Sequence, residues 1–313
     1  MPSFNPDKDI PDLTDKVIIV TGGNIGLGYE TVLQFAKHKP AHIYLGARSA
    51  EKADAAITKI KAETSSTLGI ENVPRITHLA LDLSSFASIK SAAETFNAAE
   101  QKLDILVNNA GVMGLPAATT PDGYEIQLGT NHLGGALFTR LLLPTLQRTA
   151  EAEGADVRVI NLASIAEGMT VKGGLALKDA KSDMKDFSTW TRYGQSKLAN
   201  VLYTKALAKR YPKILFASVH PGAVKTNIFA TANSGSGLVA VGSAIFTNLL
   251  AVPVQKGAWG QEWAATAPRK LVKSGAFYHP FMKEVKGSKN AQSKVLEEQL
   301  WDWTDAELSS KGF

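Results

Sequence analysis

Cysteine is absent from this chain of 313 residues. Without thiols the protein can form neither a disulfide nor a thiolate nucleophile, and nothing indicates an oxidising compartment. The six histidines do not recur at the spacing of metal ligands, so we expect no metal site. Residues 1–16 contain acids and prolines where a secretory signal needs an apolar run. These absences favour a cytoplasmic protein.

A concentration of charge of one sign is also missing. The net charge is +5, and the 34 Lys and Arg residues are scattered among 29 Asp and Glu residues. Such a pattern gives little support to nucleic-acid binding. Hydrophobic residues make up 44% of the chain, which is enough for a sizeable core. No repeat or polar linker divides the chain, so we expect a single domain over residues 1–313.

One long uncharged stretch covers residues 237–254, close to the lower length limit of a membrane span. Its glycines and the polar Ser243, Thr247 and Asn248 make it a weak span. We interpret it as part of an irregular, apolar lid over a substrate pocket, within residues 228–285. A membrane contact by this stretch stays open as the alternative.

Strand-like and helix-like patterns alternate along most of the chain. Six short apolar runs predict buried strands, at residues 16–21, 42–46, 76–81, 103–107, 157–160 and 214–219. Amphipathic segments between them predict helices, at residues 27–38, 50–63, 85–101, 122–149 and 190–210. A short helix at 257–267, a last strand at 276–279 and a helix at 291–303 follow. This order predicts an α/β fold, a Rossmann-type doubly wound parallel sheet of about seven strands with helices on both faces.

A glycine-rich turn, Thr-Gly-Gly-Asn-Ile-Gly-Leu-Gly at residues 21–28, joins the first strand to the first long helix. The glycines Gly22, Gly26 and Gly28 permit tight backbone angles and a close approach of a pyrophosphate, and the helix start offers free N–H donors. We therefore predict a dinucleotide phosphate site here. An ordinary glycine-rich turn is the alternative interpretation.

The end of the second strand indicates which dinucleotide is bound. An NAD site needs a carboxylate there to accept a hydrogen bond from the ribose 2′-hydroxyl. This chain has Gly46-Ala47-Arg48 instead. A guanidinium can make a bidentate contact with a 2′-phosphate, so we predict NADP(H). A solvated surface arginine is the alternative.

Tyr193 and Lys197 stand four residues apart in Tyr-Gly-Gln-Ser-Lys, on one face of a predicted helix. A phenol has a pKa of about 10, and a cation within a few ångströms lowers it by about one to three units. Tyr193 is therefore a candidate acid/base. Because Tyr and Lys often share a helix face, a purely structural pair is the alternative.

Further motifs lie where strands end: Leu-Val-Asn-Asn-Ala-Gly at 106–111, Asn-Leu-Ala-Ser at 161–164 and His-Pro-Gly-Ala-Val-Lys-Thr at 220–226. Thr-Asn-His-Leu-Gly at 130–134 lies in the helix between the first two of these motifs. The carboxyl ends of parallel strands form the ligand site of such a sheet. In order and spacing these motifs resemble the short-chain dehydrogenase/reductase family over nearly the whole chain. Residues 193–205 are most similar to its retinol-dehydrogenase-like branch.

The resemblance implies a catalytic role for four residues. Tyr193 would exchange a proton with the substrate oxygen, and Ser164 would orient that oxygen. Lys197 would hold the nicotinamide ribose and lower the pKa of the phenol. Asn131 would position a water that relays protons to Lys197.

The resemblance also implies a set of cofactor contacts. They are Gly22, Asn24, Ile25, Gly26, Gly28, Arg48, Asp82, Leu83, Asn109, Tyr193, Lys197, Val224 and Thr226. By position in the family's motifs, Asp82 and Leu83 would lie at the adenine, Asn109 at the adjacent ribose, and Val224 with Thr226 at the nicotinamide amide.

We therefore expect an NADP(H)-dependent oxidoreductase that acts on a small, apolar ketone, aldehyde or alcohol. Two alternatives stay open: an NADP(H)-binding sensor or interaction module without turnover, and a biosynthetic enzyme that uses the pocket for a non-redox step. We expect residues 166–190 to form an insertion beside the substrate pocket, and we expect no N-terminal membrane anchor like that of the retinol-type branch, so the resemblance does not imply a substrate. Relatives form dimers or tetramers through helices equivalent to 122–149 and 190–210, and the C-terminal third could cover such a face.

Overall fold

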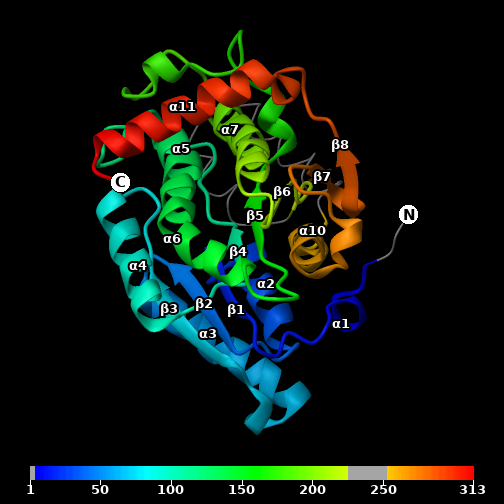
Figure 1. The fold of residues 1–313 in the computed structure, drawn as a ribbon. Coiled ribbons are helices and arrows are strands. Elements are labelled where there is room, and N and C mark those ends of the chain that lie inside the picture. The colour runs from blue at the N-terminus through cyan, green and yellow to red at the C-terminus, as the bar shows by residue number, and fades with distance from the viewer. Residues whose placement is uncertain (1–3, 225–251) are drawn as a thin grey trace.

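The computed structural model describes residues 4–224 and 252–313. Its centre is one sheet with the strand order β3-β2-β1-β4-β5-β6-β7-β8 (Figure 1). The strands are β1 Val17–Thr21, β2 His42–Ala47, β3 Arg75–Ala80, β4 Ile105–Asn108, β5 Arg158–Leu162, β6 Leu215–Val219, β7 Phe277–His279 and β8 Lys283–Val285. Strand order reverses between β1 and β4, and this switch point is where such sheets bind ligands.

The predicted Rossmann-type sheet is confirmed, with one strand more than expected. The first seven strands pair in parallel, whereas β8 runs antiparallel to β7, with Tyr278 opposite Glu284. The sequence Lys-Glu-Val of β8 is short and charged, as is common at the edge of a sheet. It therefore lacks the apolar run by which the other strands were predicted.

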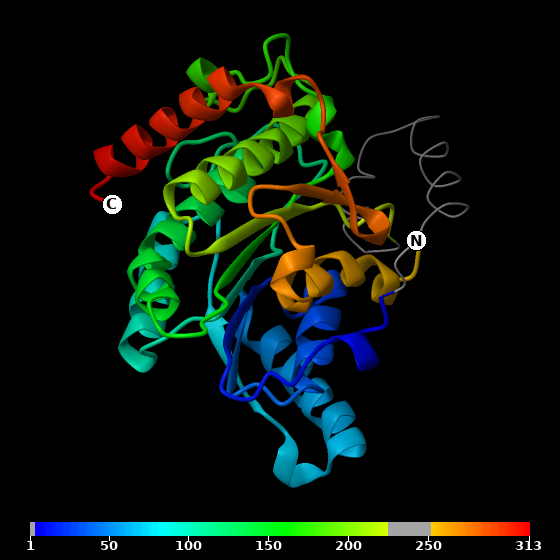
Figure 2. The same ribbon diagram turned by 45° about the vertical axis from the view of Figure 1, so that its right-hand side comes forward.

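Helices cover both faces of the sheet (Figure 2). They are α1 Pro6–Asp9, α2 Gly26–Ala36, α3 Ala50–Leu68, α4 Phe86–Ala99, α5 Ile126–Leu128, α6 Gly135–Ala150, α7 Thr189–Arg210, α10 Val254–Thr266 and α11 Lys294–Ser310. Successive residues of β1 point into the two different cores on either side of the sheet. Ile19 packs with α4, α6 and α7, and Ile18 packs with α2, α3 and α10. This alternation follows from the twofold period of side chains along a strand.

The prediction of one continuous helix over residues 122–149 was wrong, because the helical segment begins later and is interrupted. Helix α5 begins only at Ile126, because the Glu125 carboxylate accepts hydrogen bonds from the amides of the first turn. A π-helical turn, Gly129–Gly134, separates α5 from α6. Gly134 is required there, since a Cβ would overlap the carbonyl oxygen of Leu83.

The C-terminal helix α11 lies across α7 and reaches α6 (Figure 1). Arg140 of α6 pairs with Asp305 at 2.6 Å, and the Tyr203 ring of α7 stacks on Trp301 with the ring centroids 5.4 Å apart. Helix α11 therefore covers part of the outer face of α6 and α7.

The described part of the predicted lid region 228–285 is regular structure. Helix α10 packs against α2, and β7 and β8 extend the sheet. Residues 225–251, with most of the uncharged stretch 237–254, lie outside the described residues. Within residues 4–224 and 252–313, no helix has both the length and the hydropathy needed to cross a membrane.

Candidate functional site

The glycine turn between β1 and α2 has the backbone that a phosphate site requires. Gly22 and Gly26 have φ of +67° and +58°, in the region that favours glycine. At Gly28 a Cβ would overlap the Gly22 carbonyl oxygen and lie 2.5 Å from Nδ2 of Asn109. The residue before α2, Ile25, is 63% exposed and gives the helix no side-chain cap. The first amides of α2 are thus available to an anion.

Asn109, which directly follows β4, holds this turn through its side-chain amide. Its Nδ2 donates to the carbonyl oxygens of Thr21 at 2.8 Å and Gly22 at 3.5 Å. The Ala110 amide also donates to Thr21 Oγ1 at 2.9 Å. The amide group of Asn109, which the family resemblance assigns to a ribose contact, therefore holds the turn in this structure.

Arg48 lies at the same edge of the sheet, directly after β2. It is exposed, and it precedes Ser49, the N-cap of α3. No described acid forms an ion pair with it. Asp82 and Leu83 follow the neighbouring β3, and Oδ1 of Asp82 accepts hydrogen bonds from the amide and hydroxyl of Ser84 at 2.9 and 2.7 Å. A free guanidinium and the glycine turn on one edge fit a dinucleotide that carries an extra phosphate.

Two of the remaining predicted cofactor contacts, Asn24 and Val224, are among the described residues. Val224 is buried and pairs with Val252 in an isolated parallel bridge. Asn24 is half-buried within the glycine turn. Thr226 lies outside the described residues.

The four predicted catalytic residues come together beyond β4 and β5. Ser164 follows β5, Tyr193 and Lys197 lie on α7, and Asn131 lies in the π-helical turn. The Ser164 hydroxyl lies against the Tyr193 phenol. Nζ of Lys197 donates to the carbonyl oxygen of Leu162 at 3.0 Å and lies 5.7 Å from the centre of the Tyr193 ring. Tyr193, Lys197 and Asn131 are all buried.

Burial shifts the pKa values of both members of the Tyr193–Lys197 pair. Burial raises the pKa of Tyr193 to about 12, although the hydrogen bond with Ser164 acts in the opposite direction. Burial also lowers the pKa of Lys197 to about 8. The cost of burying a phenolate is the largest effect on this pKa, and the lowering of the phenol pKa by Lys197 stays a prediction. Tyr193 carries its proton at neutral pH.

Each polar atom of the Asn131 side chain has a protein partner. Its Nδ2 donates to the Val112 carbonyl oxygen at 2.8 Å and to Ser196 Oγ at 2.9 Å, and its Oδ1 accepts from the Val112 amide at 2.7 Å. Asn131 thus fastens the π-helical turn to α7 and to the loop after β4. Single π turns of this kind are frequent at functional sites.

An apolar wall stands next to the phenol of Tyr193. Met113 and Ala166 pack with Tyr193 in one buried cluster, and the Trp190 ring meets the Tyr193 ring edge-on with the centroids 6.3 Å apart. Ile165, in the short helix after Ser164, is 64% exposed. Trp190 was not predicted to belong to the site, although its position one helical turn before Tyr193 could have indicated it.

Three comparisons with known proteins agree with this geometry. A family model described as short chain dehydrogenase matches residues 16–237. An uncharacterized oxidoreductase of Schizosaccharomyces pombe is 42% identical over 276 residues, which is 87% of this chain and 78% of that protein. Retinol dehydrogenase 12 of Mus musculus is 40% identical over 215 residues, 68% of this chain and 63% of that protein. Among solved structures, NADPH-bound carbonyl reductase from chicken fatty liver is similar with a TM-score of 0.60 at 23% identity, covering 87% of this chain and 99% of that one.

The matched region contains both halves of the site, from the glycine turn to Tyr193 and Lys197. The identity to retinol dehydrogenase 12 agrees with the resemblance of residues 193–205 to that branch. The similarity to the chicken enzyme supports the fold. This chain therefore belongs to the short-chain dehydrogenase/reductase family of oxidoreductases.

Proposed function

We propose that this protein is an NADP(H)-dependent carbonyl reductase, and in the reverse direction an alcohol dehydrogenase, for a small apolar ketone, aldehyde or alcohol. The observation that carries the proposal is the buried phenol of Tyr193, which lies next to Ser164 at the sheet edge that also bears the glycine turn. The name of the similar chicken protein, an NADPH-bound carbonyl reductase, supports the same reaction.

The cofactor would be held along the carboxyl edge of the sheet, and when bound it supplies the hydride. The amides of Asn24 and Ile25 would face the pyrophosphate, and the Arg48 guanidinium the 2′-phosphate. Lys197 would hold the nicotinamide ribose, with Asn109 keeping the glycine turn in shape. For the remaining contacts we keep the family's assignment, with Asp82 and Leu83 at the adenine and Val224 and Thr226 at the nicotinamide amide.

Tyr193 acts as the proton donor to the substrate oxygen, and Ser164 orients that oxygen through its hydroxyl. A pKa of about 12 keeps the phenol protonated at neutral pH, as reduction of a carbonyl requires. Alcohol oxidation needs the phenolate, so the rate of oxidation should increase as the pH rises, whereas reduction uses the form present at neutral pH. Lys197, with a pKa of about 8, is still largely charged at pH 7 and can return a proton to Tyr193.

The wall beside the phenol supports an apolar substrate. Met113 and Trp190 offer sulfur and aromatic surface next to Tyr193, and the exposed Ile165 extends it. Small-molecule sites are lined mainly by hydrophobic and aromatic side chains of this kind. Loss of NADPH absorbance in the presence of apolar ketones and aldehydes tests the reaction. NADPH binding without turnover on any of them would favour the sensor.

Replacing Arg48 with alanine is expected to weaken NADPH binding by about 10- to 100-fold, because charge-assisted contacts to a phosphate contribute about 1.5–3 kcal/mol. NADH binding should stay unchanged, since NADH has no 2′-phosphate. Calorimetric titration with each nucleotide measures both effects. Arg75→Ala is a matched control, because Arg75 is also exposed but lies at the amino end of β3. Unchanged NADPH affinity in Arg48→Ala would remove the basis for choosing NADP(H).

A further inference from the structure

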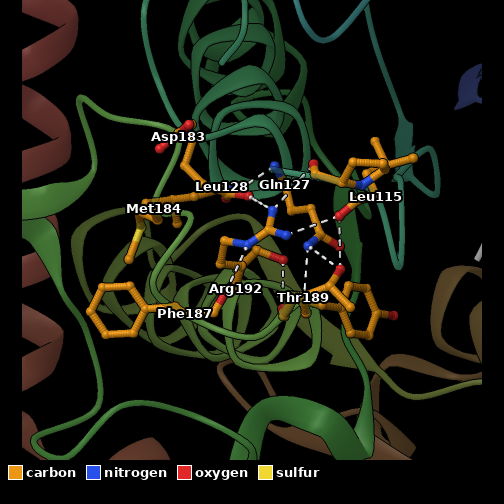
Figure 3. A network of polar contacts seen from close by, with 12 residues as sticks. Leu115, Gln127, Leu128, Asp183, Met184, Phe187, Thr189 and Arg192 are labelled. Carbon is orange, nitrogen blue, oxygen red and sulfur yellow. Dashed lines mark hydrogen bonds and ion pairs between the residues drawn. The ribbon is translucent and has the colours of Figure 1, made fainter. Parts of the chain in front are cut away.

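A buried ion pair joins Arg192, the residue before the proposed proton donor, to Glu125. Figure 3 shows the network of polar contacts around Arg192. Nη1 of Arg192 and Oε1 of Glu125 are 2.9 Å apart, and the two side chains are 4% and 0% exposed. Arg192 directly precedes Tyr193 on α7. Removing two charges from water costs several kcal/mol per ion and is tolerated only where hydrogen bonds satisfy both groups. The partners of each group therefore indicate what the pair holds together.

Glu125 controls the start of the segment that contains Asn131. Its Oε2 accepts hydrogen bonds from the Leu128 amide at 2.6 Å and the Gln127 amide at 3.0 Å. These amides belong to the first turn of α5, which continues directly into the π-helical turn. The position of Asn131 is thus fixed from its N-terminal side by this carboxylate.

Arg192 joins the first turn of α7 to two other segments. Its Nη2 donates to the Leu115 carbonyl oxygen at 3.0 Å, in the loop after β4, and its Nε donates to that of Phe187 at 3.4 Å, before α7. A planar guanidinium distributes these bonds in fixed directions, which a lysine cannot do. The rotation of α7 at Tyr193 is thereby tied to both segments.

Gln127 belongs to the same network of polar contacts (Figure 3). Its Nε2 donates to the Thr189 carbonyl oxygen at 3.0 Å, at the first residue of α7, and its Oε1 accepts from the Gly114 amide at 3.0 Å. Gly114 directly follows Met113, which packs against Tyr193. The segments that carry Tyr193, Asn131 and the apolar wall therefore meet in one set of buried bonds.

We propose that the Arg192–Glu125 pair is a positioning device that sets the placement of the Tyr193 phenol relative to Ser164 and Asn131. The inference rests on the proposed function, since it assumes that Tyr193 donates the proton. Neither side chain contacts the phenol or reacting atoms, so both are positioning residues. A displacement of about 1 Å at a reacting group can reduce a rate by about 100-fold, so a device of this kind affects kcat far more than cofactor binding.

The substitution Arg192→Lys keeps the positive charge but removes the planar guanidinium and its several N–H donors. Glu125→Gln keeps an oxygen that can accept from the α5 amides but removes the negative charge. We expect each to reduce kcat by about 10- to 100-fold, with KM and the Kd for NADPH within about two-fold of wild type. The double variant should have nearly the same kcat as each single variant, because the two residues act as one unit. Arg210→Lys is the control: Arg210 lies at the far end of α7 and pairs with Glu298 at 2.6 Å.

A second readout does not depend on turnover. In protein labelled with 13C at the tyrosine ζ carbon, the Tyr193 resonance is assigned by its loss in Tyr193→Phe. The inference predicts that this resonance, among those of seven tyrosines, shifts in Arg192→Lys and not in Arg210→Lys. A lower melting temperature with unchanged kcat and an unchanged Tyr193 resonance would overturn the inference and leave the pair a purely stabilising role. If the wild-type protein shows no turnover but the Tyr193 resonance still shifts in Arg192→Lys, the proposed function is refuted and the positioning is supported.

Discussion

Replacing Tyr193 with phenylalanine is expected to reduce kcat for carbonyl reduction by about 100- to 10,000-fold, the usual contribution of a positioned general acid. The Kd for NADPH should stay within about two-fold of wild type, because only the hydroxyl is lost. The ring can keep its packing against Met113 and Trp190. Steady-state kinetics and calorimetric titration of the same preparation measure the two quantities.

The matched control is Tyr203→Phe. Tyr203 is also a buried tyrosine of α7, but its ring stacks on Trp301 of α11, away from Ser164. We expect this variant to keep the wild-type kcat. A Tyr193→Phe enzyme with the wild-type rate would show that another group donates the proton.

Replacing Gly28 with alanine is expected to weaken NADPH binding by about 10- to 100-fold. The added methyl group would overlap the Gly22 carbonyl oxygen and press on Asn109, which holds the turn. Since Gly22 belongs to the turn and Asn109 holds it in place, relief of the clash must deform the phosphate site. Overpacking of this kind costs about 1–3 kcal/mol, and 1.4 kcal/mol corresponds to ten-fold in affinity. Calorimetric titration gives the Kd and thermal unfolding the change in stability.

Gly135→Ala separates the deformed turn from a general effect of removing a glycine. At Gly135, the first residue of α6, a Cβ would meet no atom within 4 Å. Alanine there should leave NADPH binding unchanged and add up to about 1 kcal/mol of stability through its helix propensity. Wild-type affinity in Gly28→Ala would mean that the dinucleotide is not bound at this turn.

The parts of the fold that were predictable from sequence are those with a local signal. Buried parallel strands such as β1 and β4 are continuous apolar runs, and helices such as α7 show an amphipathic period. The late start of α5 depends on the Glu125 carboxylate, whose partner Arg192 is distant in the chain. Such a contact leaves no local pattern, so the sequence predicted one continuous helix there.

The candidate site divides in the same way. Motifs at strand ends could be brought to one edge by topology alone, and the structure has Ser164 and Tyr193 together there. The pKa of Tyr193 could not be predicted from its spacing to Lys197, because depth of burial decides it. The Arg192–Glu125 pair joins residues whose separation in sequence carries no information about contact.

Hydride transfer is the central claim, and isotope transfer tests it most directly. The wild-type protein would be incubated with NADPH deuterated at C4, on either face in separate reactions, and a panel of apolar ketones and aldehydes. Mass spectrometry of the products then locates the label. The proposed function predicts an alcohol with one deuterium at the former carbonyl carbon from one of the two labelled forms, and no such product with Tyr193→Phe. NADPH binding with no deuterium in any product would contradict it and favour a protein that binds the cofactor without this chemistry.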